Sequence, residues 1–396
     1  MWRGWSSILP RMYSIADYGA MIADAPRMNA FARALEHAIA PGSLVVDIGT
    51  GTGIFALLAC RLGARRVYAI EPDETIQVAR EIATANGVAD RIEFIQAMST
   101  RVSLPERADV IVADIGGILP WFHQHLPSII DARTRFLAPG GRMIPQEDVG
   151  WAAVVEVPDV YARHAGPWKT NGFGLDMDAA HRLATNTWNR GTVTSENLLT
   201  DRRRWGAIDY RLVSETDVRA SLTWTATRAG TAHGFAAGID RTVCDGVYLS
   251  NAPDTPEAIR PKQSYGTAFF PWPSPVAVEA GDVIAIDLDA TLIGDDYTWR
   301  WKTRVENSTQ SDEKARFDQS TFFGVPLSPT TLRKRAASYT PTLNEDGRIA
   351  RLVLESIANG VTLGETAARV SSAFGGRFPR PEDALTHVAD LSRLFD

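Results

Sequence analysis

Two short apolar segments in the first quarter of the chain have the pattern of buried parallel strands. Residues 44–49 (LVVDIG) and 66–71 (RVYAIE) are rich in β-branched residues, and an apolar stretch at 54–62 (IFALLACRL) separates them. This stretch has the length and composition of a helix, which Gly63 ends. A strand, a helix and a second strand in this order predict half of a doubly wound α/β sheet.

After residue 145 the hydrophobic pattern changes to alternation, which predicts antiparallel strands with one buried face. The clearest alternating segments are WAAVVEV (151–157), SLTWTATR (221–228), VIAIDLDATLI (283–293) and YTWRWKTRV (297–305). Tyr297, Trp299 and Trp301 alternate within the last of these, so they share one face of a strand. We expect that face to belong to the core of a second, β-rich domain.

The last segment, 326–396, predicts a small helical unit. Apolar residues recur at helical spacing in RIARLVLESI (348–357) and LGETAARVSSAF (363–374), and Thr362 with Glu365 forms the capping box of the second helix. The stretch LNEDGRIARLVLESIANGVTLGETAARV resembles the helical part of PqqD-like winged-helix domains, which hold peptide leaders. The strands that usually precede those helices are not evident, and a plain helical cap is the alternative.

Composition narrows the classes of function. An apolar share of 45% with 22% charged residues is ordinary for a folded, water-soluble protein, and a net charge of −6 gives no general attraction to nucleic acid. Cys60 and Cys244 are too few for a disulfide framework or a metal cage, and we expect buried thiols and no metal site. No apolar run reaches the ~18 residues of a membrane span, and the N-terminus lacks the apolar core of a secretory signal. A cytoplasmic protein without nucleic-acid or membrane partners is the expectation.

The turn between the first strand and helix carries the candidate ligand site. Gly49, Gly51 and Gly53 allow a ligand to approach the backbone, and the acidic Glu71 ends the next strand. A dinucleotide site has a similar outline, but Asp47 within the first strand would meet a pyrophosphate with like charge. A carboxylate there suits the cationic amino group of S-adenosylmethionine, while Glu71 suits the two hydroxyls of its ribose.

From these residues the chain resembles class I S-adenosylmethionine methyltransferases, and more narrowly the protein arginine methyltransferase family. The segments YSIADYGAMIADAPRMNAFARAL, DRIEFIQAMSTRVSLPERADVIVADI and RTRFLAPGGRMIPQ carry the resemblance outside the glycine turn. It implies that Met21 packs on the sulfonium, that Arg27 holds the cofactor's carboxylate, and that Ser99 and Thr100 meet the adenine, although the family usually has glutamate in place of Thr100. The implied cofactor residues are Met21, Arg27, Asp47, Gly49, Thr50, Gly51, Gly53, Glu71, Pro72, Ser99 and Thr100.

The resemblance also implies an architecture for roughly residues 12–325. Residues 1–145 would form a seven-stranded, doubly wound Rossmann-like domain of the α/β class, preceded by helices that cover the cofactor. Residues 146–325 would form an antiparallel β-barrel with a helical dimerisation arm at about 160–200, and 326–396 the helical tail. A homodimer is the expected assembly.

The acceptor side departs from the family's pattern. Arginine chemistry in this family rests on two glutamates in a hairpin and a histidine–tryptophan pair; here Asp114 and His123 take the glutamate positions, and Ser264 and Tyr265 take the others. A guanidinium, with a pKa above ~12, becomes nucleophilic only when two carboxylates draw its charge toward one nitrogen. His123, neutral or cationic, cannot do this.

His123 suits general-base work instead, since an imidazole with a pKa near ~6.5 accepts protons near neutral pH. Asp114 is the expected group to orient it, and Gly116 and Gly117 are expected to widen the space near the methyl group. The acceptor would then be a nitrogen or oxygen nucleophile of a peptide, protein or small molecule. Two alternatives stay open, namely a guanidine N-methyltransferase and a catalytically silent binding protein that keeps the cofactor fold. A loop residue with satisfied hydrogen bonds is the expectation for His125.

Overall fold

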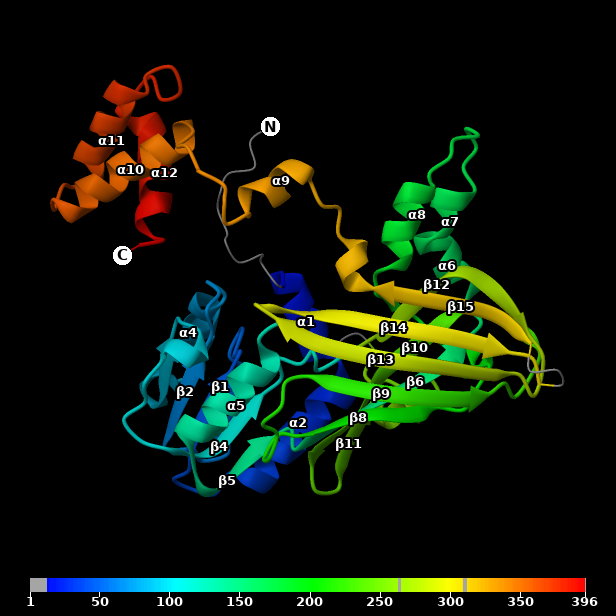
Figure 1. The fold of residues 1–396 in the computed structure, drawn as a ribbon. Helices are drawn as coiled ribbons and strands as arrows, with labels where there is room; N and C mark the ends of the chain where they lie inside the picture. Colours follow the sequence, from blue (N-terminus) through cyan, green and yellow to red (C-terminus); the bar gives the residue numbers. More distant parts are fainter. Residues whose placement is uncertain (1–12, 263–264, 309–311, 396) are drawn as a thin grey trace. The chain divides into compact units, whose positions relative to one another are not determined.

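The computed structural model describes residues 13–262, 265–308 and 312–395 (Figure 1). Tyr13–Pro326 form one compact unit, and Leu327–Asp396 belong to another. The larger unit holds a parallel sheet with its helices and two antiparallel sheets. The smaller unit is helical.

The parallel sheet has five strands in the order β3-β2-β1-β4-β5, not the seven expected from the sequence. The strands are β1 (Leu44–Ile48), β2 (Arg66–Ile70), β3 (Ile92–Ile95), β4 (Ala108–Ala113) and β5 (Leu137–Ile144). The count is smaller because the segment after β5 pairs in an antiparallel sheet instead. Strand order reverses at β1, whose neighbours are β2 and β4, and the loops that leave β1 and β4 diverge there.

Helices cover both faces of this sheet. They are α1 (Ile15–Ala23), α2 (Ala25–Ala38), α3 (Ile54–Arg61), α4 (Ile76–Ala85) and α5 (His125–Phe136). Val46 of β1 lies in the core that includes Ile129 of α5. The next residue back, Val45, lies in the core that includes Phe31 of α2 and Phe55 of α3. Alternate residues of one strand therefore face different helices, as a doubly wound sheet requires.

Two antiparallel sheets follow in the chain. The first has six strands, β6 (Glu147–Val155), β7 (Asn189–Gly191), β8 (Arg203–Asp209), β10 (Gly230–Cys244), β11 (Val247–Ser250) and β12 (Thr267–Val278). The second has four, β9 (Val218–Thr225), β13 (Val283–Ile293), β14 (Asp296–Glu306) and β15 (Glu313–Ser320). This all-β part confirms the antiparallel domain that the alternating segments predict.

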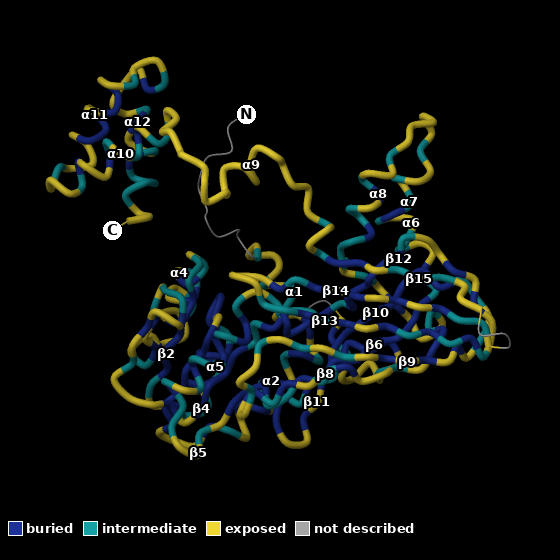
Figure 2. The backbone as a smooth tube through the Cα atoms, viewed as in Figure 1, coloured by how far each residue is buried: buried dark blue, intermediate teal, exposed yellow. Residues whose placement is uncertain are grey.

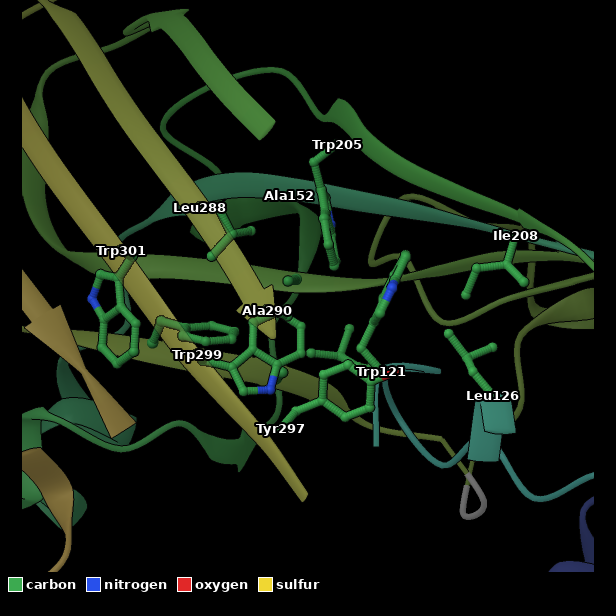
Figure 3. Close-up of a cluster of buried hydrophobic side chains, with 14 of the residues drawn as sticks. Trp121, Leu126, Ala152, Trp205, Ile208, Leu288, Ala290, Tyr297, Trp299 and Trp301 are labelled. Atoms are coloured by element: carbon green, nitrogen blue, oxygen red, sulfur yellow. The ribbon is translucent and has the colours of Figure 1, made fainter. Parts of the chain in front are cut away.

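An aromatic core lies between the two antiparallel sheets (Figure 3). Tyr297, Trp299 and Trp301 of β14 are all buried in it, as their alternation predicts. Trp121, from the loop after β4, reaches into the same core and lies 4.4 Å from Trp205 of β8, ring centroid to ring centroid. The loop that carries the candidate acceptor residues is therefore fixed to the antiparallel domain.

Three short helices project from the antiparallel domain as an arm, α6 (Pro158–His164), α7 (Gly166–Lys169) and α8 (Asp178–Thr185). The arm's tip is exposed (Figure 2), and Phe173 and Leu175 there are 85% and 62% accessible. This arm occupies the segment that the sequence assigns to dimerisation.

The smaller unit contains α9 (Pro329–Lys334), α10 (Glu345–Ala358), α11 (Leu363–Ala373) and α12 (Pro381–Ser392). The last three share a core that includes Val353, Val370 and Val388. Thr362 caps α11, because its side chain accepts a hydrogen bond from the Glu365 amide.

The cysteines and the lengths of the helices can be compared with the expectations from composition. Cys60 and Cys244 are free and buried, as expected. Within the described part of the chain, no helix has both the length and the apolar composition needed to cross a bilayer.

Candidate active site

The glycine turn after β1 is closely covered by two other segments. Gly49, Gly51 and Gly53 have positive φ angles of 71°, 53° and 86°, which side chains rarely adopt. A Cβ on Gly51 would lie 2.4 Å from the Tyr18 ring, and one on Gly49 would lie 2.3 Å from Ile115 Cγ2. Helix α1 and the loop after β4 thus both pack onto this turn, which only glycine permits.

Asp47 supplies a buried carboxylate beneath the turn. Its Oδ2 accepts hydrogen bonds from Thr50 Oγ1 at 2.6 Å and from the Ala56 amide at 3.1 Å. Its Oδ1 is buried and has no hydrogen-bond partner among the described residues. Burial raises the pKa of Asp47 to about 7. One oxygen of this carboxylate is therefore available to a cationic or hydrogen-donating ligand.

Glu71 reaches the same turn from the end of β2. Its Oε2 accepts a hydrogen bond from the Gly51 amide at 3.1 Å, and its Oε1 accepts one from the Asp73 amide at 3.0 Å, across Pro72. Burial raises the pKa of Glu71. Two carboxylate oxygens held against the turn can accept hydrogen bonds from a pair of neighbouring hydroxyls.

The remaining candidate cofactor residues flank this pair. Ser99 begins a short 3-10 helix, Ser99–Arg101, after β3; it is buried, whereas Thr100 is exposed. Met21 of α1 accepts a hydrogen bond at its backbone oxygen from Arg27 Nη1 at 3.1 Å. The candidate residues thus belong to the strand ends β1, β2 and β3 and to the helices that precede the sheet.

Arg27 connects the cofactor side to the acceptor side. Its Nε donates a hydrogen bond to Asp114 Oδ2 at 2.8 Å, and both side chains are nearly inaccessible. The guanidinium also lies over the rings of Phe31 and Phe55, at 5.6 and 5.2 Å from their centroids.

Asp114 belongs to a buried cluster of charges that the sequence pattern does not indicate. Arg241 of β10 donates from Nη1 to Asp114 Oδ1 at 2.7 Å, and from Nε and Nη2 to the two oxygens of Asp148, at 2.7 and 2.8 Å. The Tyr265 hydroxyl accepts from Arg241 Nη1 at 3.0 Å and donates to Asp114 Oδ2 at 2.6 Å. Burial favours the neutral acid, but Arg27 and Arg241 outweigh it and lower the pKa of Asp114 to about 2.

The cluster continues through Tyr210 to His125. The Tyr210 hydroxyl donates to Asp148 Oδ2 at 2.6 Å and lies 3.1 Å from His125 Nε2. Because the hydroxyl's one proton goes to Asp148, Nε2 of the imidazole carries a proton and donates it. Burial lowers the pKa of His125 to about 4, so the ring is neutral. Contrary to expectation, His125 opens α5, and its Nδ1 lacks a hydrogen-bond partner among the described residues.

His123 does not join Asp114 in this arrangement. Its side chain is 48% exposed, its Nδ1 lies 3.4 Å from Asp296 Oδ1, and its φ of 42° is left-handed. Both oxygens of Asp114 are already engaged by Arg27, Arg241 and Tyr265. In the described part of the chain, Asp114 therefore makes no hydrogen bond or ion pair with His123, although we expected Asp114 to orient it.

Gly116 serves a different purpose from the one expected. A Cβ there would lie 3.2 Å from His125 Nε2 and 3.3 Å from Arg241 Nη2. The absent side chain therefore lets the loop pack against the cluster and does not widen a space for the acceptor. Gly117, with φ of 59°, has a left-handed backbone conformation that residues with side chains rarely adopt. Ser264, the other candidate from the barrel, lies outside the described residues.

Comparisons with known proteins agree with this geometry. A family model for ribosomal protein L11 methyltransferase (PrmA) matches residues 30–145. A probable protein arginine N-methyltransferase 6 of Arabidopsis thaliana is 31% identical over 229 residues, 56% of this chain and 52% of the relative. Protein arginine N-methyltransferase 6 of Xenopus laevis is 30% identical over 227 residues, 54% of this chain and 67% of the relative. The chain belongs to the protein arginine N-methyltransferase family.

Solved structures of family members share the fold over most of this chain. Arabidopsis thaliana protein arginine methyltransferase 10 superposes with a TM-score of 0.66 at 21% identity, covering 78% of this chain and 97% of that one. A chain of the Trypanosoma brucei PRMT1 enzyme–prozyme complex superposes with a TM-score of 0.68 at 20% identity, covering 76% and 96%. The chain nevertheless spans only about half of the Arabidopsis relative that it matches in sequence.

Proposed function

We propose that this family member is an S-adenosylmethionine-dependent methyltransferase. The observation that carries the proposal is the buried Oδ1 of Asp47 beneath the glycine turn, which finds no hydrogen-bond partner in the described part of the chain, with Glu71 alongside. A cationic amino group would satisfy this oxygen, and ribose hydroxyls would find acceptors on Glu71. A dinucleotide fits less well, because its pyrophosphate would lie beside a buried carboxylate.

The residues fit this cofactor on both sides of the turn. Arg27 would hold the cofactor's carboxylate, with Met21 near its sulfonium and Ser99 and Thr100 near its adenine. When bound, the cofactor supplies a sulfonium methyl group, whose carbon–sulfur bond breaks as the acceptor's lone pair attacks and whose electron pair stays on sulfur. The chain's own task is then to present the acceptor in line and to keep water away.

The acceptor is a nitrogen or oxygen nucleophile of a peptide, protein or small molecule, presented at the end of β4. An N–H or O–H acceptor must also release one proton. Asp114, ionised and fixed by Arg27, is the candidate that positions the acceptor. His123, on the exposed side of the same loop, is the candidate base only if the loop turns inward.

Arginine N-methylation is the second candidate, and the names of the relatives favour it. The exposed apolar tip of the arm, at Phe173 and Leu175, supports a homodimer as the working assembly. One of the structural neighbours was solved as a heterotetrameric complex.

Calorimetry with S-adenosylmethionine and with its demethylated product tests the proposal. Micromolar binding by the full chain, with a loss of at least about tenfold in Asp47→Asn, is the expected result. No binding of either compound would overturn the proposal. Binding without transfer of a labelled methyl group to any acceptor in a host lysate would instead favour a catalytically silent binding protein.

A further inference from the structure

The most unusual feature of the acceptor side is a guanidinium that belongs to the chain itself. Arg241 is held by two carboxylates at once, bidentately by Asp148 and at its remaining nitrogen by Asp114. Paired carboxylates around a planar fork are the arrangement that best binds a guanidinium. Here that arrangement is filled from within the fold.

Arg241 is fixed in this position. Its side chain is 1% exposed, and the residue is the direct cross-strand partner of Asp148 between β10 and β6. The guanidinium lies 5.3 Å from the centroid of the Tyr265 ring, and the loop at Gly116 packs against its Nη2. Turning the side chain out would leave the buried Asp148 without its cationic partner and Asp114 with Arg27 alone, so the contact is a permanent part of the site.

The charges of the cluster are already balanced. Two carboxylates, Asp114 and Asp148, face the two guanidiniums of Arg27 and Arg241. The neighbouring imidazole of His125 is neutral, because burial lowers its pKa to about 4. A second guanidinium arriving beside Asp114 would find that carboxylate engaged and a fixed cation next to it, which is unfavourable at low exposure to solvent.

We infer that Arg241 determines the acceptor specificity of this protein: it takes the place of an incoming guanidinium between Asp114 and Asp148, and the acceptor is a nucleophile without positive charge. This inference rests on the proposed methyl transfer and narrows its acceptor. The expected acceptors are then neutral nitrogen nucleophiles, neutral oxygen nucleophiles and carboxylates. Arginine is excluded as an acceptor.

The first test uses the full chain with labelled S-adenosylmethionine and matched peptides that present arginine, histidine, serine or glutamate. We expect no methylguanidine product from the wild-type protein and label in at least one of the other peptides. Methylation of the arginine peptide as the preferred acceptor would overturn the inference while leaving the proposed function intact. Failure to bind the cofactor at all would overturn the proposed function instead.

The second test removes the internal guanidinium. In Arg241→Ala, methylguanidine has the vacated carboxylate pair available, and we expect it to bind at least about tenfold more tightly than to the wild-type protein. N-Methylurea, which has a similar shape but no charge, should not distinguish the two proteins. Arg241→Gln, which retains an amide for Asp148, is the companion variant in case the alanine variant does not fold.

The matched control is Arg202→Ala. Arg202 is also bound by two carboxylates, Asp240 and Asp254, but its side chain is 26% exposed and lies outside the cluster. This control should gain no methylguanidine binding. If a folded Arg241 variant, judged by unchanged affinity for the cofactor, binds methylguanidine no better than the wild type, the inference is wrong. If neither variant folds, the peptide test on the wild-type protein decides.

Discussion

At the scale of single residues, the proposed role of Asp47 in cofactor binding would tie the affinity for S-adenosylmethionine to pH. Burial raises its pKa to about 7, and burial also raises the pKa of Glu71, so both carboxyls take up protons in a range where surface carboxyls stay ionised. In the proposed site, the cationic amino group would bind the ionised form of Asp47. Protonation must therefore compete with the cofactor.

We expect affinity for S-adenosylmethionine to rise with pH and to level off above about 7, losing close to tenfold per unit below it. The sign follows from the raised pKa: the protonated carboxyl dominates on the acid side and offers no charge. Calorimetry from about pH 5.5 to about 7.5 measures it. Asp47→Asn should bind weakly and lose most of this dependence, whereas Asp109→Asn, on β4, should keep it. A flat profile in the wild type would contradict the expectation.

Substitutions of Asp114 and of His123 should have very different effects on methyl transfer. Asp114→Asn removes the charge that opposes Arg27 and Arg241, and we expect methyl transfer to fall by about a hundredfold or more, with stability lowered by about 3 kcal/mol. His123→Ala, at an exposed position where the imidazole lies beside Asp296, should stay within about twofold of the wild type. Turnover at saturating cofactor, with thermal unfolding recorded in parallel, checks both. Equal losses in the two variants would return His123 to the role of base.

At the scale of elements, contacts between residues close in the chain can be predicted from the sequence, whereas contacts between distant strands cannot. Asp47 and the glycine turn lie in one strand–turn–helix segment, so their spacing alone indicates the ligand site. The pairing of Arg241 with Asp148 depends on the register between β10 and β6, strands separated by more than seventy residues of chain. The sequence shows no local signal for that register. The number of parallel strands, five and not the expected seven, was hard to predict for the same reason. Strand β6 pairs with β8 and β10, which lie far along the chain, and so joins an antiparallel sheet.

Helix α1 is the element whose mobility should respond most to the cofactor. None of its residues is buried, and Ile15 is 54% exposed, yet Tyr18 packs against Gly51. Few buried contacts allow local opening, and a ligand beneath the helix would oppose it. We expect amide exchange in residues 15–23 to be rapid without cofactor and slowed at least about tenfold by it, while α8 in the arm stays unchanged. Equal protection of α1 in both states would contradict a covering role.

At the scale of the whole molecule, the core of the helical unit shares no residue with the cores of the larger unit. The larger unit, Tyr13–Pro326, contains every candidate site residue, and the helical unit has its own core around Val353, Val370 and Val388. Its helices also carry their own caps, at Asn344 and Thr362. A unit with a separate core and separate caps contributes little to the folding of its neighbour.

A chain that ends at Pro326 should therefore bind S-adenosylmethionine within about twofold of the full chain and unfold at a similar temperature. The reason is that no hydrogen bond of the candidate cofactor residues Asp47, Glu71 or Arg27 in the described part of the chain reaches beyond Pro326. Calorimetry and thermal unfolding of the two chains, side by side, measure this. If the shorter chain binds equally well but methylates a peptide acceptor far more slowly, the helical unit acts in capturing the acceptor, as its likeness to peptide-leader domains suggests. A large loss of cofactor affinity would show instead that the two units fold as one.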